Sequence, residues 1–107
     1  MSLARPADTN FSMVVDTSFD PVVVLPVGDL DMSAAQPFRA ALAKLIEAGH
    51  ADIDLDLSGL HFMDSTGLDV LVRVQDSMTG TLTLVDPPDL VRRMLDVCQL
   101  SDRFPVR

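Results

Sequence analysis

Two neighbouring hydroxyl side chains stand between an acid and a glycine in the segment Asp64-Ser65-Thr66-Gly67. The preceding segment 53–57 alternates apolar and polar residues, which predicts a strand, and it ends in a Ser-Gly turn signal. From Leu68 the apolar residues crowd together, as in a largely buried helix. The two hydroxyls therefore belong to a helix N-terminus, where free N–H groups and the dipole favour phosphate. The plainer interpretation is that Asp64 or Ser65 simply caps the helix.

A nucleophilic serine is the next chemistry to consider for Ser65. It follows a strand-to-helix turn, but residues 63–67 lack the Gly-x-Ser-x-Gly pattern of hydrolases. Such a serine also needs a general base, and the only histidines are His50 and His61. His50 follows a helix-terminating glycine, and His61 is isolated in a predicted loop. We expect no catalytic residue in this chain, which predicts that it is not an enzyme.

A metal site is not indicated by the acidic residues either. Asp52, Asp54 and Asp56 alternate along one predicted strand, which spreads them over about 13 Å instead of converging them. A pair formed by Asp56 and Asp64 would need further acids and a lysine, and the chain offers Lys44 alone. We expect no metal and no cofactor.

Composition limits the class of partner. The 107 residues suit one domain, and a net charge of −8 opposes binding to nucleic acid or to anionic membrane. The charge favours a partner with a basic surface, although acidity also simply keeps small proteins soluble. No apolar run approaches the roughly 18 residues of a membrane span, and the first ten residues do not resemble a signal peptide. With Cys98 as its single cysteine, the chain is expected to be cytoplasmic.

The first half of the chain predicts a flexible leader over residues 1–10, then two strands and a helix. Segment 11–15 alternates as an edge strand, and 22–25 is continuously apolar, as in a strand covered on both faces. Pairing should lapse beside Pro26, which lacks an N–H. The helix spans 33–48, and its predicted features are a Ser33–Gln36 capping box, Pro37 in its first turn and a stop at Gly49.

The second half predicts the strand 53–57, the helix that follows residue 67 and closes over 75–80, and a strand over 81–85. Asp86 is the expected cap of a last helix, whose apolar stripe is Leu90, Val91, Met94, Leu95 and Cys98. Residues 101–107 form a tail in which Phe104 packs back on the domain.

The predicted order is therefore β-β-α-β-α-β-α. Strand-helix-strand units require parallel neighbours joined by right-handed crossovers, whereas the first strand most simply pairs antiparallel. The fold class is α/β: a single domain over 11–107 with a mixed, mostly parallel sheet and packed helices.

Two longer motifs resemble a known family. Leu55-Asp56-Leu57-Ser58 followed by the segment from Phe62 to Leu68 resembles the signature of the STAS domain, in particular of bacterial anti-sigma factor antagonists. Gly28-Asp29-Leu30-Asp31 resembles the upstream element of that family, and Phe104-Pro105-Val106 its usual close. The resemblance covers nearly all of residues 11–107, and it departs at Asp69, where many relatives carry glycine.

The resemblance implies a regulatory protein of a partner-switching circuit in transcription. The unphosphorylated form would bind an anti-sigma factor and so release its sigma factor. The same anti-sigma factor, acting as a serine kinase, would phosphorylate Ser65, or alternatively Thr66, and end the complex. The predicted partner-binding residues are Gly28, Asp29, Asp31, Asp64, Ser65, Thr66, Gly67 and Asp69. The alternative is a STAS adaptor subunit of a membrane lipid transport complex, in which the serine need never be phosphorylated.

Overall fold

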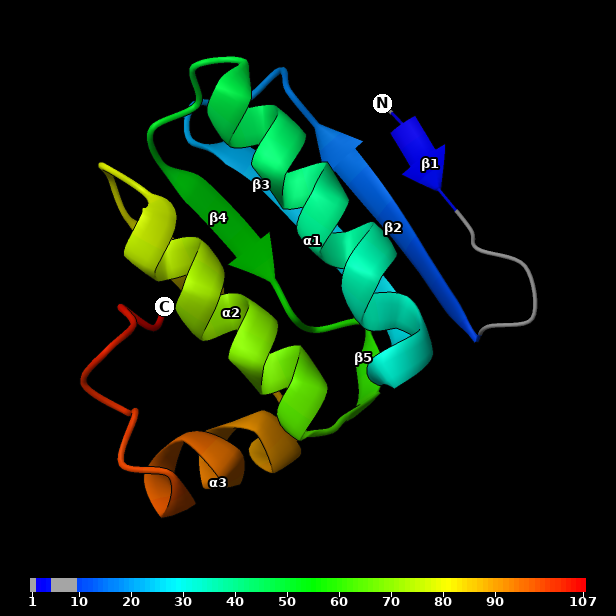
Figure 1. Ribbon diagram of the computed structural model, residues 1–107, viewed down its shortest axis with the longest axis vertical. Helices are drawn as coiled ribbons and strands as arrows, with labels where there is room; N and C mark the ends of the chain where they lie inside the picture. Colours follow the sequence, from blue (N-terminus) through cyan, green and yellow to red (C-terminus); the bar gives the residue numbers. More distant parts are fainter. Residues whose placement is uncertain (1, 5–9) are drawn as a thin grey trace.

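The structure is a computed structural model that describes residues 2–4 and 10–107, shown in Figure 1. In chain order its elements are β1 (Ser2–Ala4), β2 (Phe11–Asp16), β3 (Val22–Leu30), α1 (Met32–Glu47), β4 (Ile53–Asp56), β5 (Leu60–Met63), α2 (Ser65–Ser77), β6 (Leu82–Val85) and α3 (Asp89–Val97).

The strands form one mixed sheet in the order β1-β2-β3-β4-β6, and β5 also pairs with β3. The first three strands pair antiparallel. The pairs β3–β4, β3–β5 and β4–β6 are parallel, as the crossovers through α1 and α2 require. The predicted α/β class with a mixed, mostly parallel sheet is confirmed.

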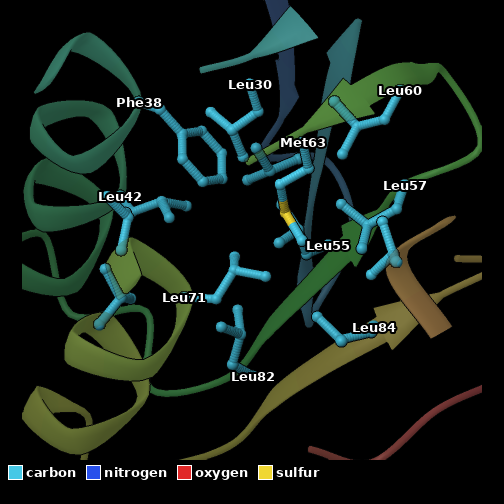
Figure 2. Packing of buried hydrophobic residues seen from close by; sticks show 14 of the residues in the cluster. Leu30, Phe38, Leu42, Leu55, Leu57, Leu60, Met63, Leu71, Leu82 and Leu84 are labelled. Carbon is cyan, nitrogen blue, oxygen red and sulfur yellow. The ribbon is translucent and has the colours of Figure 1, made fainter. Parts of the chain in front are cut away.

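Helices α1 and α2 lie side by side over one face of the sheet (Figure 1), and the core fills the space beneath them. Phe38 and Leu42 of α1 meet Leu71 of α2 and the side chains of the central strands (Figure 2). Along β3 the burial alternates, so Val22 and Val24 are buried whereas Val23 and Leu25 are half-buried. The expectation that segment 22–25 is covered on both faces was therefore wrong, because the main helices share one face.

Strand β5 was not predicted, because residues 60–63 were interpreted as a loop. It is short, and its buried residues Leu60 and Met63 are three positions apart, so it shows no alternation. Its register on β3 shifts between Gly28 and Asp29. Strand β3 pairs with β4 through its residues 22–24 and with β5 from Gly28 onward. The lapse beside Pro26 is thus as predicted.

Helix α1 begins at Met32, one residue before its predicted start, and its cap is Asp31. The predicted capping box of Ser33 with Gln36 is wrong, because both residues lie inside the helix. Pro37 lies in the second turn instead of the first, where it removes one ladder hydrogen bond. Gly49 ends the helix with a φ of 100°, as its predicted stop role requires.

Helix α3 begins at Asp89 after Pro88, which supplies no side-chain cap. Asp86, the predicted cap, instead has a φ of 49° in the turn before the helix. Val91 and Leu95 are buried as predicted, and Met94 packs partly against the core. The other two residues of the predicted stripe, Leu90 and Cys98, are exposed.

The C-terminal residues, predicted as a tail, also contact the strands β6 and β4. Phe104 is buried, as predicted, and Val106 forms a parallel bridge with Leu84. Arg107 reaches across β6 to form an ion pair with Asp54 at 2.7 Å. This last segment therefore protects the edge of β6.

The predicted leader over residues 1–10 falls largely outside the described residues. Within it, the described backbone of Ser2–Ala4 pairs with β2. No helix in the described part of the chain is both long and apolar enough to cross a membrane.

Candidate functional site

The cap of α2 is the centre of the candidate site. Asp64 has extended backbone and is the N-cap, so Ser65 is the first residue of the helix and not its cap. The Oδ1 atom of Asp64 accepts hydrogen bonds from the backbone N–H of Thr66 at 2.9 Å and of Gly67 at 3.2 Å. The cap therefore does not depend on the serine hydroxyl.

The two adjacent hydroxyls have different surroundings. The Thr66 hydroxyl donates a short hydrogen bond to Asp64, and the residue is half-buried. Ser65 is exposed, and its hydroxyl takes part in none of the hydrogen bonds among residues 10–107. Ser65 therefore presents the more accessible of the two hydroxyls.

Asp31 caps α1 in the same way as Asp64 caps α2. Its Oδ1 accepts from the Ser33 backbone N–H at 3.0 Å, the Ser33 hydroxyl at 2.7 Å and the Ala34 N–H at 3.3 Å. Each cap thus uses a carboxylate and a hydroxyl residue two positions further on. The motif Asp-x-Ser/Thr occurs at the start of both helices.

The sheet places the two caps next to each other. Leu30 and Met63, the last residues of β3 and β5, are paired in a parallel register. The backbone N–H of Asp64 donates to the Leu30 carbonyl at 3.3 Å. The two strand-to-helix junctions that hold the predicted binding residues therefore lie at one end of the sheet.

Hydrogen bonds lower the pKa of both capping carboxylates. The hydrogen bond from the Ser33 hydroxyl, followed by those from the first-turn amides, lowers the pKa of Asp31, while burial and the nearby Asp64 charge oppose the shift. The hydrogen bond from Thr66 is the largest cause that lowers the pKa of Asp64, and the backbone N–H groups of Gly67, Thr66 and Met32 add to it. Two negative charges thus flank Ser65.

Two predicted binding residues, Gly67 and Gly28, are buried. A Cβ on Gly67 would lie 2.7 Å from the Leu30 carbonyl oxygen and 2.8 Å from Cγ of Met63. Gly28 has a φ of 99°, and a Cβ there would lie 2.1 Å from the Asn10 carbonyl oxygen. These glycines let α2 and the chain before β2 approach the sheet closely.

The remaining acids of the predicted surface are anchored by neighbours. The carboxylate of Asp29 accepts a hydrogen bond from the Asn10 side chain at 3.2 Å. The backbone N–H of Asp29 donates to the Asn10 carbonyl at 2.8 Å. Asp69 forms an ion pair with Arg73 at 2.7 Å, and both side chains are more than half exposed. The charge of Asp69 is therefore partly balanced.

A groove of about 370 Å³ runs between α1 and α2 from the capped ends, with Thr66 and Asp69 among its lining residues. Met32 also lines it, and its side chain is 75 % exposed although it is large and apolar. Met32 was not among the predicted site residues. The available signal was its position off the buried stripe of Ala34, Phe38 and Leu42, which leaves an apolar side chain without a place in the core.

Two other chemistries considered above were a general base beside Ser65 and a metal site. His61 lies exposed on β5, with no hydrogen bond to Ser65 among the described residues. No group of three or more His, Cys, Asp or Glu side chains within the described ranges is close enough to hold a metal ion. The arrangement instead offers an exposed hydroxyl at the start of a helix.

The fold is that of a STAS domain. The family described as "Mlab, STAS domain" matches residues 13–106, and the chain belongs to this STAS family. It is 30 % identical over 96 residues to the anti-sigma-B factor antagonist of Bacillus subtilis (strain 168), with 87 % of each chain covered.

Solved structures show the same fold. An anti-sigma factor antagonist from Mycobacterium paratuberculosis matches with a TM-score of 0.81 at 24 % identity, over 96 % of this chain and 89 % of that one. The unphosphorylated form of the anti-sigma factor antagonist SpoIIAA matches with a TM-score of 0.64 at 25 % identity, over 78 % of this chain and 81 % of the other. The phosphorylated form of the Bacillus protein SpoIIAA matches with a TM-score of 0.68 at 23 % identity, over 89 % and 90 %.

Proposed function

We propose that this protein is an anti-sigma factor antagonist that is switched off by phosphorylation at Ser65. The observation that carries the proposal is the contrast between the two hydroxyls: Ser65 is exposed and unengaged within the described residues, whereas Thr66 is bound to Asp64. A kinase needs an accessible hydroxyl whose proton is free to pass to the catalytic base of the kinase. Ser65 meets this requirement without disruption of the cap.

Similarity to known proteins supports the proposal. The antagonist of Bacillus subtilis is 30 % identical, and SpoIIAA has been solved in both unphosphorylated and phosphorylated forms. Anti-sigma factor antagonists are a regulatory family that is usually non-catalytic. We therefore assign the chemistry to the partner, a cytoplasmic anti-sigma factor that is also a serine kinase.

The physical switch is a change of charge on a surface that is already acidic. A phosphoserine carries about −1.5 to −2 charges at neutral pH. The N–H groups of Thr66 and Gly67, which would otherwise hold a phosphate, already donate to Asp64. The phosphate would therefore face outward beside the Asp31 and Asp64 carboxylates. A partner surface fitted to the neutral hydroxyl would have to bury this dianion without a counter-charge, at a cost of several kcal/mol, enough to end the complex.

The proposed binding surface combines this switch with an apolar anchor. Ser65 and the two capping carboxylates lie at its centre, Asp29 and Asp69 at its margin, and the exposed Met32 beside them. Gly28, Thr66 and Gly67 contribute by holding the backbone in place. A complementary partner would present basic groups to the acids at the margin, an apolar pocket to Met32, and an uncharged surface closely fitted over Ser65.

The direct test is phosphorylation by a candidate anti-sigma kinase with Mg-ATP, followed by peptide mapping. We expect one phosphate, on Ser65, and none without the kinase. Ser65→Ala should remain unmodified, whereas Thr66→Val, the matched control, should still accept phosphate. Modification of Thr66 would refute the site, and modification of an aspartate would refute the mechanism as well. A complex that forms equally with and without ATP, with no modification, would favour the adaptor subunit of a lipid transport complex.

A further inference from the structure

A second concave site lies between α1 and β2, on the side of α1 that faces away from α2 (Figure 1). Its volume is about 430 Å³, within the range of small-molecule sites. We call it the α1–β2 gutter and define it by its lining residues: Met13, Val15, Thr17, Pro37, Ala40, Ala41, Lys44 and Leu45. It shares none of them with the surface around Ser65.

The sequence leaves this space open for two reasons. Core packing by α1 relies on Phe38 and Leu42, which are buried beneath the helix. The neighbouring flank carries the short side chains of Pro37, Ala40 and Ala41, which cannot fill the space above β2. Val15 of β2 is consequently only half-buried.

The polar groups of the gutter are confined to one end. Strand β2 is antiparallel to β3, and α1 connects β3 to the parallel β4, so α1 and β2 run in the same direction. Thr17, just after β2, therefore lies beside Lys44 in the last turn of α1. The rest of the lining is apolar.

Lys44 is the only lysine in the chain, and it takes part in none of the ion pairs formed among residues 10–107. The Lys44 ammonium group at one end of the apolar gutter is suited to a ligand with an anionic head group and an apolar chain. A helix with its side chains is about 10–12 Å across, so one turn would fill a space of this volume. A single acyl chain is much thinner.

We propose that the α1–β2 gutter binds a free fatty acid, with the acyl chain along Met13, Val15 and Ala41 and the carboxylate at Lys44. The hydrocarbon gains from the burial of apolar surface, and the exposed ion pair adds a smaller contribution. The site is independent of the proposed phosphorylation of Ser65.

The test is calorimetric titration of the full chain with sodium laurate below its micelle concentration, at low salt. We expect saturable one-to-one binding. Ala40→Phe places a large side chain in the gutter and should abolish binding, whereas Ala43→Phe changes another exposed alanine of α1 outside the gutter and should bind as the wild type does. Melting curves of both variants show whether each is folded.

The charge is tested separately, so the result does not depend on the phenylalanine variants. Lys44→Met should weaken laurate binding roughly two- to fivefold at low salt, as expected for an exposed ion pair, and leave binding of neutral lauryl alcohol unchanged. No saturable laurate binding, or equal binding by folded Ala40→Phe, would overturn the proposal. A dimer in sedimentation that Ala40→Phe dissociates, without laurate binding, would assign the gutter to a second copy and also overturn it.

Discussion

Asp31 and Asp64 cap neighbouring parallel helices with the same set of hydrogen bonds, and the backbone N–H of Asp64 joins the two junctions by donating to the Leu30 carbonyl at 3.3 Å. Each carboxylate replaces the missing helical acceptors of two amides. The surface around Ser65 is therefore rigid and negative before any modification. This rigidity explains how a single phosphate could act without refolding the domain.

The cap of α2 should depend on the hydrogen-bonding capacity of Asp64 more than on its charge. Asp64→Ala should lower the free energy of unfolding by about 0.5–2 kcal/mol, because two amides lose their acceptor. Asp64→Asn keeps an oxygen at the cap and should cost much less. Urea denaturation measures both. An asparagine variant as unstable as the alanine variant would show that charge, not capping, is the main contribution.

Acid should destabilise the protein through the same two caps. Because the folded-state pKa values of Asp31 and Asp64 are lowered, their contribution is fully present above the unfolded value of about pH 4 and is lost as pH falls through the folded values. Replacement of both by asparagine should flatten the dependence of unfolding free energy on pH below about 4. An unchanged slope in urea titrations at several acidic pH values would contradict this assignment.

Gly67 should matter for stability and not for recognition. Gly67→Ala places a methyl group against the Leu30 carbonyl and Met63, which should cost about 1–3 kcal/mol. Partner affinity, measured well below the melting temperature, should remain close to that of the wild type. A variant with an unchanged melting temperature but much weaker binding would show instead that Gly67 makes room for the partner.

The C-terminal ion pair should contribute more than an ordinary surface pair. Arg107→Gln leaves the Asp54 carboxylate, 10 % exposed, without its charged partner and should cost about 1–3 kcal/mol. The matched control is Arg103→Gln, because Arg103 pairs with the well-exposed Asp76 and should cost at most about 1 kcal/mol. Adding Asp54→Asn to Arg107→Gln should recover stability. Equal losses in the two single variants would show that burial of Asp54 has no effect.

Most of the sheet and its helices could be predicted because their apolar residues follow the periods of strands and helices. Strand β5 could not, since its buried residues, Leu60 and Met63, are spaced as in a helical turn and its pairing depends on a bulge in β3. The cap of α1 was predicted at Ser33 because Ser33 and Gln36 fit the capping-box pattern, although the cap is Asp31. The repeated Asp-x-Ser/Thr motif was the better signal.

The candidate site was predicted in its location but not in its internal contacts. The spacing of the segment 64–67 after a strand indicated a helix end with two hydroxyls. Which hydroxyl is engaged depends on the side-chain hydrogen bond from Thr66 to Asp64, and sequence spacing does not encode that choice. Likewise, the exposure of Met32 depends on how α1 is rotated over the sheet.

The central claim, that charge at Ser65 controls binding, is tested most directly by calorimetric titration of a candidate anti-sigma factor with the wild type, Ser65→Ala and Ser65→Asp. Ser65 is not the cap, so neither variant should lose stability through capping, and aspartate at a helix start should add about 0.3–1 kcal/mol at low salt. We expect Ser65→Ala to bind as the wild type does and to remain bound after addition of ATP. Ser65→Asp, which buries an unpaired charge under a surface fitted to the hydroxyl, should lose affinity by roughly a hundredfold or more, as a cost of several kcal/mol requires. Wild-type affinity in the Ser65→Asp variant would contradict the account.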